Sequence, residues 1–131
     1  MAGAGTVGLE IMQDLPAAQT ILLPVGDGNY IAGCAIAAKS APTPPPQIIG
    51  VQSEAAPAVA DSMRQRRIVQ IPTTLFAGGI ATTAPVPKVF AVMQELVDGM
   101  LLLSEQELLQ SIGLKRAAVY QRRRPERTAG L

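Results

Sequence analysis

In the stretch Leu23–Gly33, LPVGDGNYIAG, the end of a predicted strand, a turn and the start of a helix follow one another directly. The apolar run Thr20–Val25 ends at glycines, and the small-residue segment Tyr30–Lys39 begins directly after them. In such a turn, backbone amides and the positive end of a helix dipole attract a phosphate. The carboxylate of Asp27 lies in the same turn and would repel that anion. The stretch therefore predicts a cofactor phosphate site with one residue that does not suit it.

The rest of the chain alternates between short apolar runs and helical patterns, which predicts an α/β fold with a mainly parallel, three-layer arrangement of sheet and flanking helices. Further strands are predicted at Gln47–Gln52 and Met100–Leu103. Helices are predicted at Thr6–Asp14, Tyr30–Lys39, Ala55–Arg67, Pro87–Val97 and after the capping box Ser104–Glu107. We expect a glycine turn over Met1–Gly8 and a loop that contains two glycines over Phe76–Thr83.

The composition excludes several kinds of chemistry. The chain has 131 residues and no histidine, which removes histidine acid–base catalysis and most zinc sites, and we expect no metal site. Its single cysteine, Cys34, cannot form an internal disulfide, so we expect a cytoplasmic location. It shows no signal peptide and no apolar span long enough for a bilayer, so we expect no membrane partner.

The charge of the chain divides it into two parts. Residues 1–114 carry five basic and nine acidic residues, whereas residues 115–131 carry six basic and one acidic. We therefore predict a folded core over residues 1–113 and a disordered basic tail over residues 114–131. The arginines of the tail are not interleaved with aromatic residues, so we expect no nucleic-acid partner.

A second glycine motif lies at the start of the sequence. Gly3, Gly5 and Gly8 match G-x-G-x-x-G, and Asp27 follows Gly8 by 19 residues, as in a dinucleotide fingerprint with its ribose-binding acid. The alternative is that these glycines serve a turn and helix packing. Two functions stay open at this point: a cofactor-dependent enzyme, or a non-catalytic phosphate- or nucleotide-binding α/β module.

Five segments in order resemble the catalytic core of threonine dehydratases. They are AGAGTVGLEIMQDLP, ILLPVGDGNYIAG, QIIGVQSE, TTLFAGGIAT and ELVDGMLLLSEQEL, which begin at residues 2, 21, 47, 73 and 95. These enzymes are pyridoxal-phosphate ammonia-lyases of the tryptophan-synthase-β-like fold (fold type II), and serine racemases and serine dehydratases share the pattern. The resemblance implies that this chain is a partial fold-type II pyridoxal-phosphate enzyme.

The resemblance also implies where the cofactor phosphate binds. In the family a turn of four glycines and a small hydrophobic residue binds it, and the matching positions are Gly26, Asp27, Gly28, Asn29 and Tyr30. Three of these five residues depart from the family pattern. Further departures lie at Ala4, where a polar residue is usual, at Gly78, where an acid lies near the cofactor ring, and at Gln52, where some members have a cation-binding glutamate.

The same resemblance implies the reaction, the conversion of L-threonine to 2-oxobutanoate and ammonia, as in isoleucine biosynthesis. It places the cofactor-binding lysine upstream of the matched segment and a serine or threonine for the pyridine nitrogen downstream. We therefore assign no catalytic residue, interpret Lys39 as a surface lysine and expect the chain to be inactive alone. The expected partners are an amino-acid substrate and, as an open alternative, further copies in a homo-oligomer.

Overall fold

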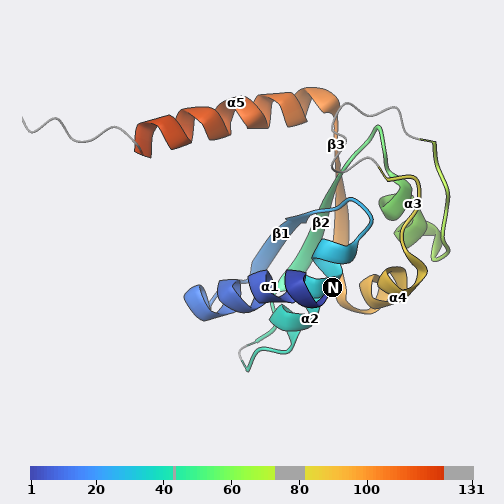
Figure 1. The fold of residues 1–131 in the computed structure, drawn as a ribbon, viewed down its shortest axis with the longest axis horizontal. Helices are drawn as coiled ribbons and strands as arrows, with labels where there is room; N and C mark the ends of the chain where they lie inside the picture. The colour runs from blue at the N-terminus through green and yellow to red at the C-terminus, as the bar shows by residue number, and fades with distance from the viewer. Residues whose placement is uncertain (43, 73–81, 123–131) are drawn as a thin grey trace, which may run out of the picture.

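The computed structural model describes residues 1–42, 44–72 and 82–122, with side chains as far as residue 113. Its elements are arranged as Figure 1 shows. In chain order they are α1 (Ala2–Asp14), β1 (Thr20–Pro24), α2 (Asn29–Lys39), β2 (Gln47–Ser53), α3 (Ala58–Gln65), α4 (Pro87–Leu96), β3 (Gly99–Leu103) and α5 (Glu105–Arg122).

The three strands form one parallel sheet in the order β1-β2-β3. Leu22 pairs with Ile49, and Ile49 pairs with Gly99, so the strands lie in register across the sheet. Each strand begins and ends within one residue of its predicted bounds. The predicted α/β fold with a parallel sheet is therefore confirmed.

One face of the sheet carries the core. Ile21, Leu23 and Ile48 are buried there with residues of α2 and α4. On the opposite face Leu22 is 61% exposed and Leu101 is 50% exposed. Within the described part of the chain the helices thus cover one face of the sheet and leave Leu22 and Leu101 on the other face exposed.

The first helix differs from its prediction. A glycine turn through Gly8 was expected, but α1 begins at Ala2 and its glycines lie inside the helix. The physical reason is the close packing of α1 on α2. A Cβ atom on Gly8 would lie 2.4 Å from the carbonyl oxygen of Cys34, and one on Gly33 would lie 2.4 Å from that of Met1. Gly8 and Gly33 are therefore needed where the backbones of α1 and α2 are in contact.

The last helix begins as predicted. Ser104 N donates to Glu107 Oε2 at 2.8 Å, and Glu107 N donates to Ser104 Oγ at 3.3 Å, which confirms the capping box. From there α5 continues to Arg122 and so passes residue 114, where the charge pattern placed the start of a tail. Figure 1 shows α5 extending away from the other helices beyond the end of β3. The rest of the predicted tail, residues 123–131, and most of the predicted loop Phe76–Thr83 lie outside the described residues.

Among the helices of the described residues, none combines the length and the apolar character that crossing a bilayer requires.

Candidate functional site

The predicted phosphate-binding turn lies at the carboxyl end of β1. Val25 N donates to Val51 O at 2.8 Å, which keeps the chain on the sheet for one residue beyond the strand. The segment Gly26–Tyr30 then leaves the sheet and leads into α2, which begins at Asn29. We call this segment the glycine loop. In parallel α/β folds, ligand sites gather at this edge of the sheet.

Gly28 is fixed by its backbone and by its neighbours. Its φ of 93° lies in the left-handed region, and it is the N-cap of α2. A Cβ atom there would lie 2.4 Å from Met93 Sδ and 3.1 Å from Val89 Cγ1, so α4 packs directly against the loop. Gly28 O also accepts the hydrogen bond from Ala32 N at 3.0 Å that starts α2.

Asp27 and Asn29, two residues that depart from the family's glycines, bond to each other. Asp27 Oδ1 accepts from Asn29 N at 2.9 Å, and Asp27 Oδ2 accepts from Asn29 Nδ2 at 2.6 Å. The N–H groups of the first helical turn have no acceptor within the helix. The carboxylate of Asp27 therefore satisfies one of these groups and places its negative charge at the N-terminus of α2, where the helix dipole favours it.

The sequence pattern did not identify Gln52 as a residue that holds the loop in place. This side chain is 1% exposed at the carboxyl end of β2. Gln52 Nε2 donates to Gly26 O at 3.4 Å, and Gln52 Oε1 accepts from Ala60 N at 3.0 Å. Gln52 thus links the glycine loop to α3. The sequence signal for this role was a polar residue at the end of an apolar strand. It does not indicate the bonding partners, because Gly26 and Ala60 lie outside that strand.

Two other predicted positions lie apart from these contacts. Tyr30 is 39% exposed in the first turn of α2. Lys39 ends the same helix about 15 Å from the loop, at about 1.5 Å per residue. Its Nζ lies 2.7 Å from Asp98 Oδ2, which also accepts from Ile48 N at 2.7 Å. Burial raises the pKa of Asp98, but the bonds from Lys39 and Ile48 outweigh it and hold that pKa below its usual value. Lys39 therefore joins α2 to the sheet.

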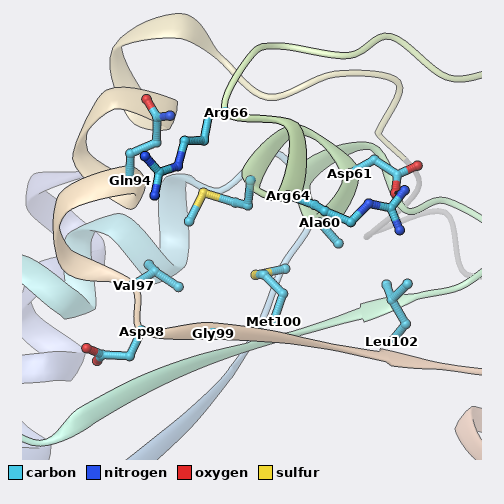
Figure 2. Close-up of a pocket in the computed structure, with 11 residues that line it drawn as sticks. Ala60, Asp61, Arg64, Arg66, Gln94, Val97, Asp98, Gly99, Met100 and Leu102 are labelled. Atoms are coloured by element: carbon cyan, nitrogen blue, oxygen red, sulfur yellow. Dashed lines mark hydrogen bonds and ion pairs between the residues drawn. The ribbon is translucent and has the colours of Figure 1, made fainter.

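A cavity of about 820 Å³ lies between α3, α4 and β3 (Figure 2). Arg66 and Gln94 lie together on one side of it, and Met100 and Val97 line its apolar part. Arg64 Nη2 pairs with Asp61 Oδ1 at 2.7 Å on the other side. No residue of the glycine loop lines this cavity, so it is separate from the predicted cofactor site.

The dinucleotide interpretation of the first glycine motif is not favoured. Its glycines lie within α1, where they allow contact with α2. Cys34 Sγ donates to Ala4 O at 3.2 Å across this contact. Asp27, the candidate ribose-binding acid, instead bonds to Asn29.

Comparison with protein families and curated sequences confirms the resemblance. The family model described as "Pyridoxal-phosphate dependent enzyme" matches residues 1–116. Over 113 residues the chain is 42% identical to the L-threonine ammonia-lyase of Geobacter sulfurreducens, which covers 86% of this chain and 28% of that protein. Over 113 residues it is 40% identical to the catabolic L-threonine dehydratase TdcB of Escherichia coli K12, covering 86% of this chain and 34% of TdcB.

Comparison with solved structures shows the same fold. The crystal structure of a threonine deaminase from T.th. matches with a TM-score of 0.80 and 34% identity, over 86% of this chain and 43% of that one. Maize serine racemase matches with a TM-score of 0.81 and 27% identity, over 86% of this chain and 35% of that one. The chain thus spans less than half of the length of each of these relatives.

Proposed function

Because this chain belongs to the pyridoxal-phosphate-dependent enzyme family, we propose that it is a segment of a threonine or serine ammonia-lyase without ammonia-lyase activity of its own. The observation that carries this proposal is the 42% identity to an L-threonine ammonia-lyase, which extends over most of this chain and over 28% of the relative. In an enzyme of this kind the substrate is an amino acid with a hydroxyl group on its β-carbon. The cofactor, when bound, supplies the electron sink for loss of the α-proton.

We infer that the glycine loop corresponds to the segment that binds the cofactor phosphate in the family. Gly26, Asp27, Gly28, Asn29 and Tyr30 are therefore the residues that we propose at the position of the family's phosphate site. The loop's place at the carboxyl edge of the sheet supports this assignment. Gly28 supports it too, since its left-handed backbone forms the sharp turn before α2.

The lysines of the segment support the proposed lack of activity. The chain has three: Lys39, Lys88 and Lys115. Lys39 is paired with Asp98 at the opposite end of α2 from the loop. Lys88 is exposed in the first turn of α4. No described contact brings either of these two side chains to the glycine loop, which supports a cofactor-binding lysine outside this sequence.

The test combines an activity assay with chemical mapping. The full 131-residue chain is mixed with pyridoxal phosphate and L-threonine, and 2-oxobutanoate is measured against cofactor alone. A parallel sample with cofactor is treated with borohydride, and modified lysines are located by peptide mass mapping. We expect no product above the control and no more modification of Lys39 or Lys88 than of Lys115. Measurable turnover, or selective modification of Lys39 that disappears in Lys39→Arg, would contradict the proposal.

We also propose a cytoplasmic location, with an amino acid as the small-molecule partner and with a homo-oligomer as a further alternative. The free, buried thiol of Cys34 supports a reducing compartment. The exposed Leu22 and Leu101 on one face of the sheet support self-association. Light scattering coupled to size-exclusion chromatography measures the oligomeric state directly. A monomer at every protein concentration would contradict the homo-oligomer alternative.

A further inference from the structure

The residues of the glycine loop do not fit a phosphate. A phosphate at this position needs backbone N–H donors that have no other acceptor. Here the N–H of Asn29, in the first turn of α2, already donates to Asp27 Oδ1 at 2.9 Å. The side-chain amide of Asn29 donates to the other carboxylate oxygen at 2.6 Å. The backbone N–H of Asn29 and one N–H of its side-chain amide are therefore used by an anion that belongs to the chain.

Charge acts in the same direction as hydrogen bonding. Asp27 is half-buried, and its carboxylate lies at the N-terminus of a helix of 11 residues. This is where the helix dipole stabilises one negative charge. A phosphate placed beside it would be repelled at short range, because a half-buried carboxylate is only partly screened by water.

The loop is also held in this form from several sides. Gly26 O accepts from the buried Gln52, Gly28 packs against Met93, and Gly28 O accepts the first hydrogen bond of α2. Each of these contacts joins the loop to another part of the fold. They hold the loop in the form in which the carboxylate of Asp27 bonds to Asn29.

We infer that the carboxylate of Asp27 replaces the cofactor phosphate at the glycine loop, so that the loop is ordered without cofactor and excludes phosphate. This inference rests on the proposed function, because that proposal places the family's phosphate site here. The inference goes beyond the proposed function because it gives Asp27 a structural role in the loop. The aspartate is then a built-in substitute for the ligand.

The test measures thermal unfolding of the full chain with increasing inorganic phosphate, at constant ionic strength set with chloride. We expect the Tm of the natural chain to be unchanged by phosphate. In Asp27→Gly the carboxylate is lost, so Tm falls by several degrees without phosphate. Phosphate then raises the Tm of this variant, because a ligand that binds only the folded state stabilises it. Asp14→Asn, at an exposed position in the last turn of α1, is the control for net charge and should behave like the natural chain.

A second variant keeps the inference testable if Asp27→Gly does not fold. Asp27→Asn keeps an oxygen that can accept from Asn29 N but removes the charge. In a phosphate titration followed by NMR, we expect the amide signal of residue 29 to shift in Asp27→Asn and to stay unchanged in the natural chain. A shift of similar size in both chains would overturn the inference. So would a Tm of the natural chain that rises with phosphate as much as that of Asp27→Gly.

These readouts are independent of the activity assay. Product formation from L-threonine would overturn the proposed function. The Tm and NMR titrations with phosphate would still test the inference about Asp27. Conversely, phosphate binding by the natural chain would overturn the inference that Asp27 replaces the phosphate. A lack of product in the activity assay would still support the proposed function.

Discussion

The two glycine motifs of this chain look alike in sequence and do different things in the fold. In Gly3–Gly8 the glycines lie inside α1, where most backbone N–H groups are already bonded to the preceding turn of the helix. In Gly26–Gly28 they lie in a turn that leads into α2, at a helix N-terminus whose N–H groups have no acceptor within the helix itself. In both motifs glycine marks a place where the backbone comes close to another group. Whether that approach concerns a ligand depends on the element around it.

The neighbours of the two motifs also differ in how far they can move. A Cβ atom on Gly8 would meet the backbone of Cys34, whereas one on Gly28 would meet the end of the Met93 side chain. A packed helix backbone moves only with its whole helix. A methionine side chain can change rotamer at a lower cost. This contrast predicts that the helix contact is the less tolerant of the two motifs.

The largest effect is expected for Gly8→Ala. The new Cβ atom would lie 2.4 Å from the carbonyl oxygen of Cys34 and 2.9 Å from its Cα, so α1 and α2 must move apart. We expect a loss of about 3 kcal/mol in the free energy of unfolding, the upper range for overpacking. Urea unfolding followed by circular dichroism measures it. Gly5→Ala, whose Cβ atom would lie 3.4 Å from its nearest neighbour, is the matched control. Equal stabilities of the two variants would refute the backbone contact as the cause.

A smaller loss is expected for Gly28→Ala. The left-handed φ of 93° costs an alanine about 1 to 2 kcal/mol, and displacement of Met93 adds to this. We expect about 2 kcal/mol in total by urea unfolding. The same change made in a Met93→Ala background isolates the contribution of Met93, because the backbone cost and the contact with Val89 Cγ1 at 3.1 Å then remain. If the loss is the same in both backgrounds, the contact with Met93 contributes nothing.

The two motifs also show how far sequence reasoning reaches. The end of β1 and the start of α2 were predicted within one residue, because an apolar run stops sharply at glycines. The start of α1 was missed, because glycine has a low helix propensity and only contact with α2 explains it there. The bonds between Asp27 and Asn29, and those of Gln52 to Gly26 and Ala60, depend on side-chain directions and on distant segments. No local pattern contains that information.

The thiol of Cys34 reports on the helix contact without a change of backbone. Burial raises its pKa above the usual value, although hydrogen bonds with the Gly8 backbone and the Tyr30 side chain act in the opposite direction. Reaction with a thiol reagent therefore requires α1 to lift from α2. We expect Gly8→Ala to react about fivefold faster than the natural chain in native buffer, which corresponds to about 1 kcal/mol in the opening equilibrium. Gly28→Ala should react at nearly the natural rate. A higher rate in both variants would mean that the loop and the helix contact open together.

The smallest effect is expected for Gly3→Ala, and it decides whether the first motif acts as a unit. A Cβ atom at this position would have no neighbour within 4 Å. Alanine also favours helix over glycine, so we expect a change between zero and a gain of about 0.5 kcal/mol in urea unfolding. A phosphate-binding fingerprint would need its first glycine for the turn, whereas a helix contact needs only the glycines that touch the partner helix. A loss for Gly3→Ala as large as that for Gly8→Ala would contradict the helix-contact interpretation, because packing alone gives this residue nothing to collide with.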